Sequence, residues 1–156
     1  MFHVVLVEPE IPPNTGNIAR LCLGADATLH LVRPLGFLID DKTLKRAGMD
    51  YWKQTRVVLW DNLAQLQAAH PQGRFWYLTT KCSRPYYEAH LEAGDFLVFG
   101  RETKGLPEPL LEANAERCLT IPMAGQTRSL NLATSVGIVL FEGLRQVRTA
   151  PGAPQA

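Results

Sequence analysis

The chain has 156 residues, of which 46% are hydrophobic and 20% charged, and these values are typical of one globular domain. Its 16 Lys and Arg residues face 15 Asp and Glu residues, so the formal net charge is +1 and any nucleic-acid contact must come from a local patch. Cys22, Cys82 and Cys118 form no C-x-x-C pair, which argues against a disulfide framework or a cysteine zinc site and indicates a reducing, cytoplasmic location.

Neither a membrane nor a metal is expected from the sequence. The N-terminus enters a strand-like pattern without a basic segment or a long apolar stretch, so we expect no signal peptide and no transmembrane helix. The histidines at positions 3, 30, 70 and 90 have no ligand spacing, and we expect no bound metal. His30 lies inside a predicted strand and is interpreted as structural.

Short apolar runs alternate with helical patterns along the chain. The runs predict strands at residues 2–7, 28–32, 55–60, 75–79, 96–100 and 118–121. The helical patterns predict helices at residues 14–25, 40–48, 62–69, 107–113 and about 130–147. This alternation predicts an α/β fold with a mostly parallel sheet flanked by helices. We expect one domain over residues 1–148, followed by a disordered tail at 149–156.

The first polar segment that a fold alone would not require lies near the N-terminus. Pro12 and Pro13 disfavour a helix, so Asn14 is predicted to cap the helix that follows. Helical spacing places Ile18, Leu21, Cys22 and Ala25 on the core-facing side. Arg20 then points about 150° away from this side, beside Gly16 on the exposed face. Arg20 is therefore either a solvated surface arginine or a contact to a ligand or to another backbone.

The second polar segment follows the predicted strand that ends at Gly100. Its residues, G-R-E-T-K-G-L-P, open a loop at the carboxyl end of a strand, where open α/β sheets bind ligands. Leu106 and Pro107 stand where a phosphate-binding P-loop needs Lys and Ser or Thr, and no strand is followed by G-x-G-x-x-G. The sequence thus argues against nucleotide sites of these two kinds, and the loop could also be an ordinary glycine turn.

The third segment follows the last predicted strand. I-P-M ends that strand, residues 124–128 form a flexible polar loop, and S-L-N opens a helix rich in small and β-branched residues. Apolar residues surround this helix for nearly three turns, which predicts burial against several neighbours. Ser129 is predicted either to cap the helix or to contact a ligand, and the two roles are compatible.

The order of three motifs carries more information than any of them alone. The chain has N-x-G-N-I-A-R near its N-terminus, then L-V-F-G-R-E-T-K-G-L-P, and finally I-P-M followed by S-L-N-L-A-T-S-V. This arrangement resembles the SPOUT (SpoU–TrmD) methyltransferases over nearly the whole chain. The stretches V-E-P-E-I-P-P-N-T-G-N-I-A-R and D-D-K-T-L-K-R-A-G-M-D-Y-W resemble more narrowly the TrmL subfamily, which methylates the wobble 2'-oxygen of certain leucine tRNAs.

The resemblance implies a cofactor and a fold. The cofactor is S-adenosyl-L-methionine, and the C-terminal part of the α/β fold is threaded through a loop as a trefoil knot. By motif, the implied cofactor contacts are Leu78, Thr79, Gly100, Ile121, Met123, Ser129, Leu130 and Asn131. All lie at predicted strand ends or at a helix N-terminus, where unpaired backbone N–H and C=O groups can bind adenine and ribose.

The resemblance also implies a reaction, methyl transfer to a ribose 2'-hydroxyl with the participation of Arg20. Accounts of the family give this arginine the role of proton acceptor, but a guanidinium has no acceptor and a pKa above about 12. We therefore expect Arg20 to orient the hydroxyl and to stabilise developing alkoxide charge, while water or a phosphate oxygen takes the proton. Asn14 and Glu102 are expected to hold Arg20 or the second-motif loop in place.

A basic helix is predicted to add contacts to RNA. Asp40 can cap it, and Tyr51 and Trp52 follow, a combination that suits phosphates and unpaired bases. The predicted RNA-binding residues are Lys42, Lys45, Arg46 and Arg128. A solvated amphipathic helix fits the spacing equally well, and the resemblance favours RNA.

At this length we expect no appended RNA-binding domain. The resemblance implies a homodimer in which Arg20 of one subunit serves the cofactor of the other, with the N-terminal and C-terminal helices at the interface. The expected activity is 2'-O-methylation of cytidine or uridine 34 in tRNA. An rRNA 2'-O-methyltransferase and a non-catalytic RNA-binding knot protein are the alternatives.

Overall fold

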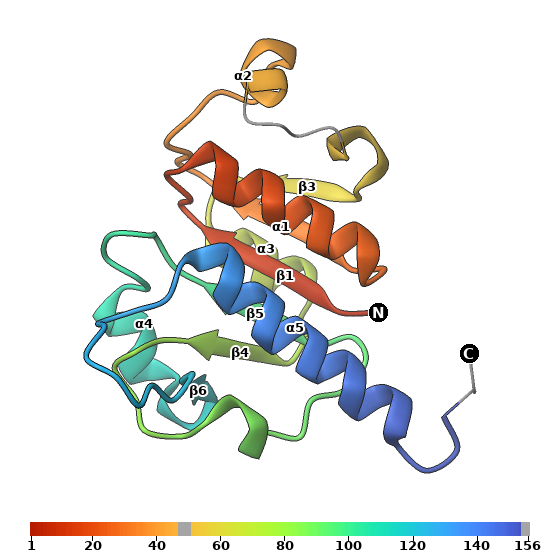
Figure 1. The fold of residues 1–156 in the computed structure, drawn as a ribbon, viewed down its shortest axis with the longest axis vertical. Helices are drawn as coiled ribbons and strands as arrows, with labels where there is room; N and C mark the ends of the chain where they lie inside the picture. Colours follow the sequence, from red (N-terminus) through yellow and green to blue (C-terminus); the bar gives the residue numbers. More distant parts are fainter. Residues whose placement is uncertain (47–50, 154–156) are drawn as a thin grey trace.

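A parallel β-sheet runs through the middle of the molecule (Figure 1), and the computed structural model describes residues 1–46 and 51–153. The strands are β1 (His3–Val7), β2 (Thr28–Val32), β3 (Val57–Trp60), β4 (Phe75–Leu78), β5 (Phe96–Phe99) and β6 (Cys118–Leu119). Their order across the sheet is β3-β2-β1-β5-β4-β6, and every pair is parallel. The predicted α/β fold with a parallel sheet is confirmed.

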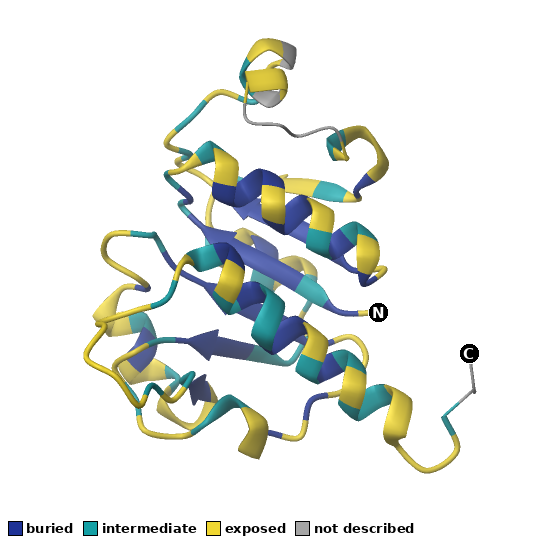
Figure 2. Ribbon diagram, viewed as in Figure 1, coloured by how far each residue is buried: buried dark blue, intermediate teal, exposed yellow. Residues whose placement is uncertain are grey.

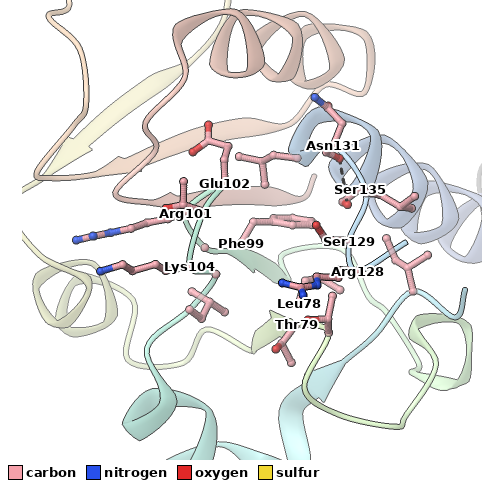
Figure 3. A pocket seen from close by; sticks show the side chains of 18 of the residues that line it. Leu78, Thr79, Phe99, Arg101, Glu102, Lys104, Arg128, Ser129, Asn131 and Ser135 are labelled. Carbon is pink, nitrogen blue, oxygen red and sulfur yellow. Dashed lines mark hydrogen bonds between the residues drawn. The ribbon is translucent and has the colours of Figure 1, made fainter. Parts of the chain in front are cut away.

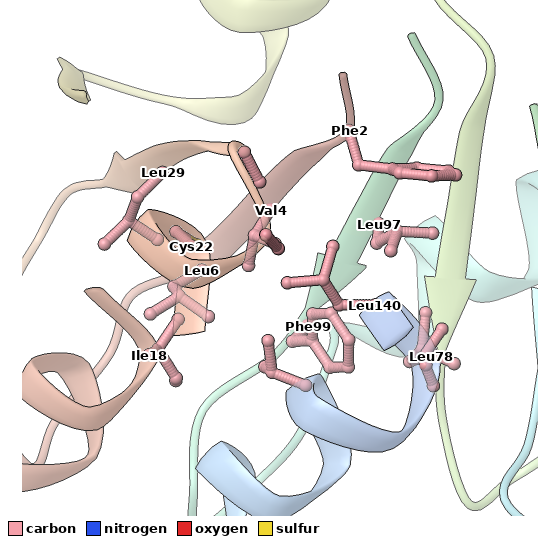
Figure 4. Close-up of a cluster of buried hydrophobic side chains, with 14 of the residues drawn as sticks. Phe2, Val4, Leu6, Ile18, Cys22, Leu29, Leu78, Leu97, Phe99 and Leu140 are labelled. Atoms are coloured by element: carbon pink, nitrogen blue, oxygen red, sulfur yellow. The ribbon is translucent and has the colours of Figure 1, made fainter. Parts of the chain in front are cut away.

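Helices cover both faces of the sheet, which explains why the central strands are continuously apolar. α1 (Pro12–Gly24) and α5 (Leu132–Thr149) pack on one face, where Ile18, Cys22 and Leu140 join the side chains of the larger core (Figure 4). α3 (Leu63–Ala69) and α4 (Glu108–Ala113) contribute Leu66 and Leu111 to the core on the opposite face. The central strands β1, β2 and β5 are therefore buried on both sides (Figure 2).

Shorter helical elements lie at the ends of the sheet. α2 (Asp41–Arg46) and η1 (Trp52–Gln54) precede β3, while η2 (Tyr86–Glu88) and η3 (Ala115–Arg117) lie near β6. α2 projects beyond the β3 edge, at the opposite end of the molecule from the last turns of α5 (Figure 1). The side chain of Asp40 accepts a hydrogen bond from Thr43 N at 2.7 Å, which confirms the predicted cap. The predicted end of this helix, at 47–48, lies outside the described residues.

The start of α1 differs from the prediction. The helix begins at Pro12 after Ile11, because proline is favoured in the first turn, where its missing N–H costs no helical hydrogen bond. Asn14 is consequently a buried residue of the first turn, and the prediction that it caps the helix is wrong. Gly16 is also buried, so it does not share an exposed face with Arg20 as expected.

The start of α5 also differs. Asn131 caps the helix by accepting from Thr134 N at 3.2 Å, whereas Ser129 lies two residues earlier and is exposed, so the cap predicted at Ser129 is wrong. α5 also extends to Thr149, into the predicted tail. α5 packs against α1, β5 and η2, as the predicted burial against several neighbours requires, while Phe141 is 46% exposed.

The chain after β6 lies beside the chain after β4, as a threaded segment requires. Pro85 and Thr120 form a parallel bridge, in which Thr120 N donates to Arg84 O at 2.8 Å and Tyr86 N donates to Thr120 O at 2.8 Å. The trefoil knot itself stays a prediction.

Three histidines that are far apart in the sequence meet on the α3 face of the sheet, beside Phe96. Trp60 Nε1 lies 3.0 Å from His30 Nδ1 and can only donate, so His30 must carry its proton on Nε2. This Nε2–H then donates to His3 Nδ1 at 2.9 Å. The ring centroid of His70 lies 5.8 Å from that of His3 and 6.0 Å from that of His30. Protonation of His30 on Nδ1 would break the bond from Trp60.

The histidine cluster predicts that the protein loses stability in mild acid. Burial, reinforced by positive neighbours that include His70, lowers the pKa of His3 to about 4 and that of His30 to about 3. Both pKa values lie below the value of 6.5 for an unfolded chain. At a pH between these values the unfolded chain therefore binds more protons than the folded protein. The contribution of the two neutral histidines to the free energy of unfolding should be fully present above pH 6.5, and it should decrease as the pH drops towards 4.

Urea unfolding at a series of pH values measures this effect. In His3→Asn, the amide oxygen replaces Nδ1 as acceptor and cannot titrate, so the loss of stability between pH 6.5 and 5 should become smaller. His90→Asn is the matched control, because the His90 side chain is 83% exposed. An equal effect of both substitutions would contradict the role given to the cluster.

Candidate functional site

A cavity of about 550 Å³ lies at the carboxyl ends of β4 and β5, beside the turn after β1. From β1 the chain builds β2 and β3 on one side of the sheet, whereas β5, β4 and β6 lie on the other side. The strand order therefore reverses between β1 and β5, next to the cavity. Open α/β sheets bind ligands at such a point, and the volume is that of a small-molecule site.

Most of the residues predicted from the motifs line this one cavity (Figure 3). All eight predicted cofactor contacts do so: Leu78, Thr79, Gly100, Ile121, Met123, Ser129, Leu130 and Asn131. Asn14, Glu102 and Arg128 line it as well. The structure thus brings together segments far apart in the sequence, such as Asn14 and Asn131, which are 117 residues apart and in direct contact.

The sequence analysis missed other lining residues. Phe99, Arg101 and Lys104 belong to the strand end and the loop already singled out, so the position of that loop could have identified them. Ser135 lies one turn inside α5 and donates its hydroxyl to Asn131 O at 3.2 Å (Figure 3). No sequence pattern marks Ser135 as a site residue, because only the observed start of α5 shows that it faces the cavity.

The loop after β5 turns back tightly against its own start. Arg101 N donates to Gly105 O at 3.3 Å and Gly105 N donates to Arg101 O at 2.9 Å. Gly105 has a φ of 66°, a conformation that glycine adopts without strain. A Cβ on Gly100 would overlap the backbone of Gly105 and Leu106, so this position of the cavity wall requires glycine.

Three carboxylates lock this loop to the turn after β1. Glu102 accepts hydrogen bonds from Glu10 N at 2.9 Å and Ile11 N at 3.1 Å. In return, Glu10 accepts from the Thr103 hydroxyl at 2.7 Å, and this bond holds the pKa of the Glu10 carboxyl below its usual value. Glu8 pairs with the Arg101 guanidinium at 2.8 and 3.2 Å. Glu102 therefore fixes the second-motif loop, as expected, and it does not contact Arg20.

An amide pair joins α1 to α5 at the edge of the cavity. The Asn131 amide donates to Asn14 Oδ1 at 3.0 Å, while Asn131 Oδ1 caps α5. Asn14 is 8% exposed, so a partner is needed to satisfy its side-chain oxygen. Within one chain Asn14 thus links α1 to α5, and its proposed action on Arg20 stays a prediction.

The chemical character of the cavity fits S-adenosylmethionine. Leu78, Phe99 and Ile121 offer apolar surface for a flat base, and the start of α5 offers free N–H groups for hydroxyls. Lys104 and Arg128 line the cavity without an ion-pair partner in the described part of the chain, so they can meet a carboxylate or a phosphate. In residues 1–46 and 51–153, no group of three or more His, Cys, Asp or Glu side chains could hold a metal ion.

Arg20 lies apart from the cavity. It is exposed on α1 and lines a second groove, of about 520 Å³, between α1 and α5. Gly137 and Phe141 of α5 lie in this groove, and Asn131 lines both the groove and the cavity. The predicted RNA-binding residues Lys42, Lys45 and Arg46 are exposed on α2, and they adjoin neither the cavity nor the groove.

Comparison with known proteins gives consistent matches. The model of the SpoU rRNA Methylase family matches residues 1–141. The tRNA (cytidine(34)-2'-O)-methyltransferase of Escherichia coli K12 is 47% identical over 149 residues, which are 94% of each chain. A solved structure described as "Structural insights into the 2-OH methylation of C/U34 on tRNA" has a TM-score of 0.88 and 45% identity, and covers 94% of this chain and 95% of that chain. An AdoMet-bound rRNA methyltransferase of Sinorhizobium meliloti has a TM-score of 0.81 and 27% identity, over 94% of this chain and 56% of its own.

Within the described residues, no helix combines the length and the hydropathy needed to cross a membrane.

Two glycines of the loops around the cavity allow a matched test of its wall. Gly100→Ala should lower the free energy of unfolding by about 1–3 kcal/mol and weaken S-adenosylmethionine binding, because the new methyl group overlaps the loop backbone. Gly125→Ala is the control, since a Cβ there meets nothing within 4 Å. Thermal unfolding and calorimetric titration measure both effects, and equal behaviour of the two variants would refute the tight turn.

Proposed function

Because the chain belongs to the SpoU rRNA methylase family, we propose that it transfers a methyl group from S-adenosylmethionine to the 2'-hydroxyl of nucleotide 34 of tRNA. The observation that carries this proposal is the single cavity formed by all three motifs at the carboxyl ends of β4 and β5. The names of relatives that match over most of both chains support the wobble cytidine or uridine as the substrate.

The chain's own residues would hold the cofactor from three sides. When bound, it supplies an electrophilic methyl group on a sulfonium. Leu78 and Ile121 present apolar surface to its base, while the start of α5 after Asn131 presents N–H groups. The Gly100 turn brings the loop backbone to the opposite wall. Fixing both reactants in this way can account for several kcal/mol of the barrier.

Arg20 has the role of binding the acceptor ribose. Its guanidinium can donate to the 2'-oxygen and to a neighbouring phosphate, and it stabilises the charge that grows on the oxygen as the proton leaves. It cannot take that proton, because a guanidinium has no acceptor. A water molecule or a phosphate oxygen accepts it.

The position of Arg20 supports a role for a second copy of the chain. Arg20 lines the α1–α5 groove and is not among the residues around the cavity. The same groove leaves Phe141 46% exposed beside Gly137, a combination that permits close packing of a further helix. We propose a homodimer built on α1 and α5, in which Arg20 of one subunit serves the cavity of its partner.

Complementation between two inactive variants tests this arrangement. Arg20→Ala removes the guanidinium, and Met123→Trp fills the cavity. Each variant alone should be inactive, whereas chains coexpressed with different tags should recover about a quarter of the wild-type rate, since half of the dimers are mixed and each has one intact site. A mixture as inactive as its components would show that Arg20 acts within its own subunit.

α2 and Arg128 are proposed to bind the RNA backbone. Lys42, Lys45 and Arg46 are exposed and form no ion pair in the described part of the chain, so their charges are available to phosphates. Trp52 is partly buried against the core, whereas Tyr51 is exposed.

Replacing the three basic residues of α2 by alanine should weaken tRNA binding. The plot of the logarithm of the association constant against the logarithm of the salt concentration should also become less steep, by roughly two to three in the size of its negative slope. The double variant Arg145→Ala/Arg148→Ala, at the far end of α5, controls for general loss of charge and should have a smaller effect. Filter binding over a range of salt concentrations measures this. An unchanged affinity of the α2 variant at physiological salt would remove α2 from the interface.

The proposed function is tested by methyl transfer from labelled S-adenosylmethionine to tRNA from cells that lack this protein. Nuclease digestion and mass mapping should locate a 2'-O-methyl group on nucleotide 34, and Arg20→Ala should abolish it. Transfer to rRNA alone would identify an rRNA enzyme of the same reaction type. Absence of any transfer, together with no rise of the Tm in saturating cofactor, would identify a non-catalytic RNA-binding protein.

A further inference from the structure

The guanidinium of Arg20 lies over an aromatic ring that belongs to none of the three motifs. Arg20 Cζ lies 5.1 Å from the centroid of the Tyr51 ring, within the range of a cation–π contact. In the described residues the Arg20 side chain forms no ion pair and no hydrogen bond, so this ring is its identified partner. We propose that Tyr51 is a positioning residue that orients Arg20 towards the acceptor ribose.

The turn that carries Tyr51 is fastened to α1 next to Arg20. The Thr55 hydroxyl lies 2.9 Å from Tyr51 O and 3.1 Å from Ala19 O, so its proton is shared between the two carbonyl oxygens. Thr55 N also donates to Tyr51 O at 3.1 Å. Thr55 is 8% exposed, which shields these bonds from water. Because Ala19 immediately precedes Arg20, the turn and the arginine are fixed to the same point of α1.

The neighbouring residue prevents the turn from shifting. Trp52 packs against the larger core, while Tyr51 is 36% exposed. The ring of Tyr51 thus remains on the surface beside Arg20, although its backbone is anchored from two directions. An exposed arginine otherwise samples many rotamers, and a fixed ring reduces the entropy lost when the guanidinium binds the ribose.

The contact needs a ring and no hydroxyl. The attraction arises from the negative face of the ring, which phenylalanine shares, whereas an aliphatic side chain of similar size lacks it. Tyr51→Leu should therefore lower kcat by about three- to thirtyfold, and Tyr51→Phe should restore most of it. The KM for tRNA and the Kd for S-adenosylmethionine should change little, because Tyr51 acts through Arg20.

This inference rests on the proposed function, and one of its readouts is independent of activity. In the free protein, the ring current of Tyr51 should shift the Arg20 Nε–H resonance upfield, and Arg20→Lys identifies that signal by its loss. The shift should disappear in Tyr51→Leu and persist in Tyr51→Phe. Tyr87→Leu, which alters an exposed tyrosine on η2, is the matched control and should affect neither the resonance nor kcat.

The two readouts separate the possible failures. An unshifted Arg20 resonance in the wild type, or one unaffected by Tyr51→Leu, would overturn the positioning role even if the enzyme methylates tRNA. A rise in the KM for tRNA with unchanged kcat would also overturn it, since Tyr51 would then stack on RNA itself. If the wild type methylates nothing, the proposed function fails, and the resonance still decides whether Tyr51 holds Arg20.

Discussion

The exchange of hydrogen bonds between the turn after β1 and the loop after β5 determines the geometry of the rest of the site. Glu102 reaches across to the backbone of residues 10 and 11, and Glu10 reaches back to Thr103. Each of these bonds has a carboxylate as acceptor, and charge-assisted hydrogen bonds are shorter and stronger than bonds between neutral groups. Because β1 and β5 are neighbours in the sheet, these bonds fix the position of the start of α1 and of one wall of the cavity.

Asn131 extends this control from the cavity to the surface where the second subunit is proposed to bind. It caps α5, holds Asn14 of α1, and lines both the cavity and the groove. A change in the tilt of α1 relative to α5 would therefore move Asn131 and alter both the cavity and the groove. Asn131 thus physically connects the cavity with the groove in which we propose that the second subunit packs.

Much of the architecture could be predicted from the sequence, because buried parallel strands are continuously apolar and Gly100 ends such a strand. The starts of α1 and α5 could not, since Asn14, Ser129 and Asn131 are all suitable caps by type. In the structure Pro12 and Pro13 occupy the first turn of α1, and Asn131 rather than Ser129 accepts the hydrogen bond that caps α5. Similarly, the spacing of Arg20 showed that it points outward, but only the assembled helices show that it lies away from the cavity. The histidine cluster escaped prediction because its members belong to different strands and helices.

The cavity draws its walls from residues 11 to 135, so it cannot be complete until residue 135 has been synthesised. During synthesis the β1–α1 region emerges first, yet the segment from Ile121 to Ser135 must arrive before a binding site closes. Incomplete nascent chains would then be inert, because they could neither capture the methyl donor nor present a finished wall to RNA. Parallel pairing of strands that are distant in the sequence also folds slowly, so closure of the cavity should lag behind synthesis of the segments that form it.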